Sequence, residues 1–151
     1  MLLVRCDKRF KKMTEKFLKE MNLSAEITDE DICDVCVMEE NDASFIHNIP
    51  ADSIIIANGD NHDLVMTLGQ YNNKVITCGL AGICTITLSS ITDEEIVVCI
   101  QRNITDLCGK CIMPQEIPVK AKSLTPHDAM LMYALALVCG EKPDKLILEG
   151  R

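Results

Sequence analysis

A cluster of polar residues follows the most strongly β-branched stretch of the chain. Residues 53–57 read Ser-Ile-Ile-Ile-Ala, and the candidate ligand-binding residues come directly after them: Asn58, Asp60, Asn61, His62 and Asp63. A continuous β-branched run is typical of a parallel strand that is covered on both faces. Open α/β sheets bind ligands where such strands end and helices begin. Asn, Asp and Gly are also what a strand-to-helix turn and a helix N-cap require, so a purely structural role stays open.

A second polar cluster, Thr125-Pro-His127-Asp128, opens the most apolar segment of the sequence. Threonine followed by proline, with an acidic residue three positions after the threonine, predicts the start of a helix. His127 and Asp128 then lie in the first helical turn, where the positive end of the helix dipole can receive an anion. They complete the candidate ligand site, with capping as the alternative explanation.

Nine cysteines include two C-x-x-C pairs, Cys33 with Cys36 and Cys108 with Cys111. Four thiolates can bind zinc tetrahedrally, and each pair could instead perform thiol redox chemistry. Seventy-one residues separate Cys36 from Cys108, which is far more than in a compact zinc ribbon. Buried thiols that act as small apolar side chains are the third interpretation.

Motifs for nucleophilic catalysis and for phosphate binding are missing from this sequence. It contains three histidines and no Gly-x-Ser-x-Gly turn. The first predicted turn between strand and helix, residues 6–14, contains no glycine that would let backbone amides surround a phosphate.

Apolar periodicity predicts the elements that must position these clusters. Leu2–Val4 indicates a short buried strand, followed by a helix with apolar positions at helical spacing: Phe10, Met13, Phe17, Leu18 and Met21. The lysines and arginine between 8 and 19 form the solvated face of that helix. The acidic segment 23–52 favours an irregular connection with at most one short strand, ended by Pro50.

The remaining elements follow in a regular order. A helix over 64–71 and a strand over 74–78 complete a right-handed β-α-β crossover with the strand at 53–57. Antiparallel strands are predicted within 85–88, 96–100 and 111–119, with Gly109 and Lys110 as a two-residue hairpin loop. A buried helix runs from Pro126 to Cys139 and ends at Gly140, and residues 143–148 could start one more short helix.

The predicted fold is therefore an α/β domain with a mixed sheet. Parallel β-α-β units come first, antiparallel hairpins follow, and a buried helix comes near the carboxyl end. We expect residues 1–151 to form a single domain, with 1–52 as a β-α unit and acidic connection.

The segments from residue 53 onward resemble, in order and spacing, the second half of the central ATPase domain of Mur ligases and folylpolyglutamate synthases. Residues 55–61 resemble the family's apolar strand followed by Asn-Ala-Asp-Asp, and residues 74–80 resemble its strand ending in Thr-Phe-Gly. Residues 83–119 resemble its antiparallel strands, 125–140 its Gly-x-His-Asn helix, and 143–148 the short helix beyond.

The resemblance implies a nucleotide site in which Asp60 faces the ribose. The chain departs from the family at Asp128, where the family has asparagine, and at Leu131, where a second asparagine would stand. It also lacks the family's Gly-x-x-Gly-Lys-Thr loop, and phosphoryl transfer depends on that loop. The expectation is a non-catalytic Mur-ligase-like module that binds a nucleotide, another small anionic ligand or a protein partner. A zinc or thiol redox protein and one subunit of a split ATP-dependent ligase are the alternatives.

Composition limits the partners. The 151 residues carry a net charge of −8, aromatic residues make up 3%, and tryptophan is absent, so nucleic acid is not an expected partner. The longest apolar run, residues 129–139, is too short to cross a membrane. The first residues reach charge at Arg5 and lack the apolar stretch of a secretory signal, so we expect a cytoplasmic location.

Overall fold

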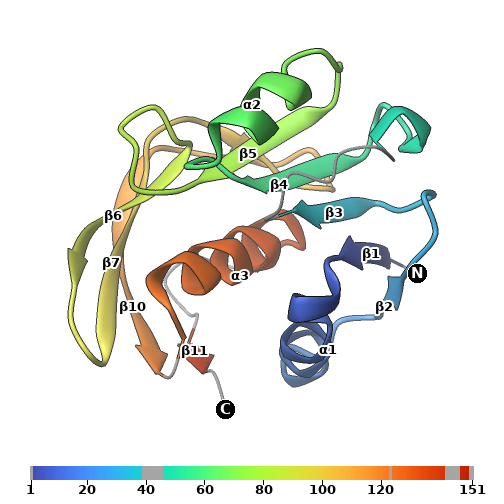
Figure 1. Cartoon of the computed structure of the whole chain (residues 1–151). Coiled ribbons are helices and arrows are strands. Elements are labelled where there is room, and N and C mark those ends of the chain that lie inside the picture. Colours follow the sequence, from blue (N-terminus) through green and yellow to red (C-terminus); the bar gives the residue numbers. More distant parts are fainter. Residues whose placement is uncertain (1, 39–45, 123, 142–146, 150–151) are drawn as a thin grey trace.

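The computed structural model describes residues 2–38, 46–122, 124–141 and 147–149. Five parallel strands make up one half of a mixed sheet, in the order β2 (Ala25–Thr28), β1 (Leu2–Cys6), β3 (Val35–Met38), β4 (Ile54–Asn58) and β5 (Lys74–Cys78). The chain leaves β1 toward the edge strand β2, then passes back across β1 to β3 (Figure 1). This reversal is the topological switch point of the sheet.

The other half of the sheet is mainly antiparallel. It contains β6 (Ile86–Ile91), β7 (Glu95–Ile100) and β10 (Gln115–Lys122), with β11 (Ile147–Glu149) parallel to β10 at the edge. One parallel pair, Cys78 with Ile86, joins β5 to β6. Strands β8 (Ile104–Thr105) and β9 (Cys111–Ile112) form a separate small hairpin. The predicted α/β class, the mixed sheet and the order of parallel before antiparallel strands are thus confirmed.

Helices cover both faces of the parallel half. α1 (Lys11–Glu20) and α3 (Pro126–Val138) lie on one face, while α2 (His62–Leu68) lies on the other (Figure 1). Right-handed crossovers that run in opposite directions from the switch point place their helices on opposite faces. In β4 the side chain of Ile56 belongs to the α3 core and that of Ile55 to the α2 core, which is why the strand is apolar throughout.

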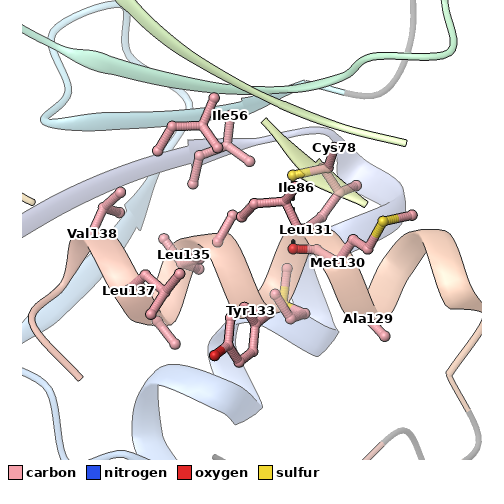
Figure 2. Packing of buried hydrophobic residues seen from close by; sticks show 14 of the residues in the cluster. Ile56, Cys78, Ile86, Ala129, Met130, Leu131, Tyr133, Leu135, Leu137 and Val138 are labelled. Carbon is pink, nitrogen blue, oxygen red and sulfur yellow. Dashed lines mark hydrogen bonds between the residues drawn. The ribbon is translucent and has the colours of Figure 1, made fainter. Parts of the chain in front are cut away.

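α3 is the centre of the larger core. Every residue from Asp128 to Val138 is buried, because the sheet curves around the helix and α1 lies beside it (Figure 1). Figure 2 shows side chains of α3 packed toward Ile56, Cys78 and Ile86 of three neighbouring strands. The predicted start and end are confirmed, since Thr125 is the N-cap and Gly140 has a φ of +95° after the last turn. No helix in the described ranges is both long and apolar enough to span a membrane.

α1 is amphipathic as predicted. Phe17 and Leu18 are buried against the sheet, and the lysines of the helix are exposed. A short 3₁₀ turn, η1 (Lys8–Phe10), links β1 to α1 and carries the buried Phe10.

The prediction for the acidic segment was wrong, because this segment contains two strands, β2 and β3. β3 is buried on both faces between β1 and β4, and flanking acidic residues obscure its short apolar run. β2 pairs with β1 alone, and its four residues give little alternation to detect.

The prediction of a short helix over 143–148 was wrong for the residues that the structure describes. Ile147 and Leu148 lie in the strand β11, which pairs with the outer side of β10, while 143–146 lie outside the described residues.

The predicted two-residue hairpin loop is instead a five-residue turn from Asp106 to Lys110. The Oδ1 atom of Asp106 closes this turn by accepting hydrogen bonds from the amides of Cys108 (2.9 Å) and Lys110 (2.8 Å).

Candidate functional site

A pocket of about 470 Å³ opens at the carboxyl ends of the strands on either side of the switch point. We call it the switch-point pocket, and its lining residues are Arg5, Cys6, Asp7, Lys8, Asp29, Cys36 and Val37. The strand order produces it, since the chain leaves β1 toward β2 on one side and leaves the adjacent β3 toward β4 on the other, which opens a crevice between the ends of β1 and β3. Open α/β sheets place ligands in crevices of this kind.

The charged side chains of the switch-point pocket are of both signs. Arg5 Nη1 donates to Asp31 Oδ1 at 2.7 Å and to the Asp29 carbonyl at 2.8 Å, which fixes the loop after β2 to β1. Lys8 is exposed at the mouth, and Asp7 lies beside it. Cations at such a wall can bind carboxylate or phosphate oxygens, and carboxylates can accept hydrogen bonds from ligand hydroxyl or amino groups.

Cys6 contributes a neutral thiol to this wall. Burial is the main cause that raises the pKa of Cys6 to about 11. The Thr14 hydroxyl opposes it, and the nearby carboxylates of Asp7, Glu15 and Asp29 each add a smaller increase. Cys6 is therefore protonated at neutral pH and serves as a small packing side chain rather than as a nucleophile.

Sequence reasoning missed the switch-point pocket. The pocket depends on β2 taking the edge position beside β1, and neither β2 nor this strand order was predicted. The first strand-to-helix turn, residues 6–14, borders the pocket but gives no sequence signal for it, because it contains no glycine-rich phosphate loop.

The predicted cluster at 58–63 lies at the carboxyl end of β4, and its oxygens hold the turn and the neighbouring loop. Asn58 Oδ1 accepts from the Asp60 amide at 2.9 Å, and Asn61 Oδ1 caps α2 by accepting from Leu64 at 3.1 Å. His62 and Asp63 are exposed in the first turn of α2. The turn and N-cap roles considered for this sequence are therefore present.

Asp60 fastens the loop that follows β5. Its two carboxylate oxygens accept hydrogen bonds from the amides of Leu80 (2.9 Å) and Ala81 (3.0 Å). The carboxylate lies directly over Gly79, where a Cβ atom would come within 2.7 Å of it. A pair of backbone amides that could receive a ligand anion thus binds a carboxylate of the chain itself.

His127 and Asp128 lie at the start of α3, at the same edge of the sheet. The Asp128 amide donates to Thr125 Oγ1 at 3.1 Å, and Asp128 Oδ1 pairs with Arg9 Nη2 at 3.0 Å. His127 Nε2 is buried without a hydrogen-bond partner in the described structure. Within the described ranges, no hydrogen bond or ion pair joins this cluster to Asp60 or His62.

The two C-x-x-C pairs do not meet. Cys36 belongs to the core on the α2 face, whereas the β8–β9 hairpin that carries Cys108 and Cys111 packs through Ile104 and Ile112 on the α3 face. Across the described residues, no three His, Cys, Asp or Glu side chains gather as a metal site. A zinc site built from all four cysteines is therefore not formed.

Cys33 and Cys36 do contact each other. A hydrogen bond from Cys36 is the main cause that lowers the pKa of Cys33, with a further contribution from Arg5, against the opposing effect of burial. The same hydrogen bond, together with burial, raises the pKa of Cys36. The two thiols thus differ in acidity, with Cys33 as the more readily ionised sulfur.

Comparison with known proteins gives no family for this chain, because no protein-family model matches it and no significantly similar curated protein is found.

Proposed function

We propose that this chain is a non-catalytic module of Mur-ligase-like architecture that binds a small anionic ligand in the switch-point pocket. The observation that carries the proposal is a pocket lined by two cations and two carboxylates at the point where the order of the described parallel strands reverses. The order of parallel and antiparallel elements supports the Mur-ligase-like part of the proposal.

The charges of the pocket favour one class of ligand. Lys8 and Arg5 suit a phosphate or carboxylate group, and Asp7 and Asp29 suit hydroxyl or amino donors on the same molecule. A nucleoside phosphate or a sugar phosphate carries both kinds of group. The proposed ligand is therefore an anion with hydroxyl groups, of which a nucleotide is one example.

The turn after β1 explains why binding would not lead to phosphoryl transfer. It contains no glycine and passes directly into η1, so it cannot surround a triphosphate with backbone amides. Catalysis of that transfer relies on such amides together with lysine and Mg²⁺. We therefore propose binding without turnover.

Calorimetric titration of the full chain with ADP, UMP and inorganic phosphate tests the proposal. Lys8→Gln removes an exposed cation at the pocket, and we expect it to weaken binding of the preferred ligand about fivefold, equivalent to about 1 kcal/mol. Lys12→Gln is the matched control, because Lys12 is an exposed lysine on α1 that does not line the pocket.

The proposal fails if none of these ligands binds at millimolar concentration. It also fails if the two lysine variants weaken binding equally, since that result would indicate general attraction between the ligand and a basic helix.

A further inference from the structure

The Cys33–Cys36 pair is a dithiol at the wall of the switch-point pocket, where Cys36 is a lining residue. The backbone between the two cysteines is fixed on both sides. The Asp34 amide donates to the Leu3 carbonyl at 2.8 Å, Asp34 Oδ2 accepts from the Leu3 amide at 2.7 Å, and the Ile54 amide donates to the Asp34 carbonyl at 3.0 Å. The segment is thus held between β1 and β4.

The backbone of each of the two cysteines is also fixed by its neighbours. Ser53 Oγ donates to the Cys33 carbonyl at 2.5 Å, and Cys36 lies in β3 opposite Arg5 of β1. Cys33 is 4% exposed and Cys36 forms part of the wall of the switch-point pocket. Both cysteines belong to the buried cluster on the α2 face, and a small oxidant that enters the switch-point pocket meets the pair on its Cys36 side.

We propose that Cys33 and Cys36 form a reversible disulfide, with hydrogen peroxide as the oxidant and a small dithiol as the reductant. The Cys33 thiolate attacks a peroxide oxygen, so an S–O bond forms, the O–O bond breaks, and the leaving hydroxide takes up a proton as water. Cys36 sulfur then attacks the sulfenic acid of Cys33, so the S–S bond forms, the S–O bond breaks, and the Cys36 proton leaves with the second water. Each cysteine is oxidised by one electron and the peroxide is reduced by two.

The roles of the two thiols follow from their surroundings. The hydrogen bond from Cys36, and secondarily Arg5, lower the pKa of Cys33, so Cys33 supplies the attacking thiolate. Cys36 keeps its proton and acts as the resolving thiol. Other buried cysteines lack this arrangement, because burial is the main cause that raises the pKa of Cys78 and of Cys84.

The experiment uses the full chain with the exposed cysteines removed, as the C108S/C111S variant. After exposure to hydrogen peroxide and blocking of free thiols, non-reducing peptide mapping by mass spectrometry should find Cys33 linked to Cys36. Dithiothreitol should restore both thiols. Cys78 and Cys84 serve as internal controls and should remain unmodified.

Two further variants in the same background assign the roles. Cys36→Ala removes the hydrogen-bond donor, so alkylation of Cys33 should begin at higher pH, and dimedone should trap a sulfenic acid at Cys33. Cys36→Ser keeps a donor and should leave the pH dependence of Cys33 alkylation closer to that of the C108S/C111S parent.

The proposal is overturned if peroxide produces no Cys33–Cys36 disulfide, or if Cys36→Ala leaves the pH dependence of Cys33 alkylation unchanged. It is independent of the proposed ligand binding. A chain that binds no anion could still form the disulfide, and a chain that binds an anion could fail to form it.

Discussion

At the residue scale, Asp60 shows how a residue typical of a ligand site can serve the fold instead. Its carboxylate bridges the turn after β4 to the loop after β5 through two backbone amides. Hydrogen bonds to a charged acceptor contribute more than neutral ones, and leaving such amides unpaired is costly.

Asp60→Asn tests this role because it keeps the size of the side chain but leaves one acceptor oxygen for two amides. We expect it to lower the free energy of unfolding by about 1–2 kcal/mol. Asp63→Asn, at an exposed position in the same segment, should change it by less than about 0.5 kcal/mol. Urea unfolding followed by circular dichroism measures both, and equal effects would contradict the assigned role.

At the scale of the element, α3 depends on its first turn. The helix is apolar on every side, so its start is set by local polar contacts rather than by an amphipathic pattern. Thr125 caps it, and Asp128 reaches across to Arg9 in η1, which ties the helix to the end of β1.

Thr125→Ala should destabilise the protein by about 1 kcal/mol, because the Asp128 amide loses its side-chain acceptor. Thr125→Ser retains the oxygen and should stay within about 0.5 kcal/mol of the parent chain. Thermal and urea unfolding report the difference, and a Thr125→Ser variant as unstable as Thr125→Ala would argue against capping.

Elements with long or repeated signals could be predicted from the sequence, and those defined by their neighbours could not. β5 was predicted with its observed limits, and α3 to within one residue at its end. Their apolar runs end at glycines, Gly79 and Gly140, and Thr125 and Pro126 mark the start of α3. β2 and β11 are short edge strands whose stability comes from pairing with β1 and β10, and a single sequence does not show that pairing.

The candidate site also has a part that could be predicted from the sequence and a part that could not. Polar residues after β4 and before α3 were found from sequence, and their turn and cap contacts are observed. The switch-point pocket combines residues of β1 and β3 with residues that follow β1 and β2, so it emerges only from the strand order. The C-x-x-C spacing made a contact between Cys33 and Cys36 predictable. Their separation from Cys108 and Cys111 was not predictable, because it depends on which face of the sheet each pair packs against.

At the scale of the whole molecule, the reversal of strand order beside β1 opens a crevice at the carboxyl edge of the sheet, and we propose that the ligand binds there. Amide chemical-shift mapping of the labelled full chain during titration with ADP tests this assignment most directly. We predict the largest saturable shifts at the amides of Asp7, Lys8 and Asp29. Shifts confined to residues 58–63 and His127, or no shifts at millimolar ADP together with none from UMP or phosphate, would contradict it.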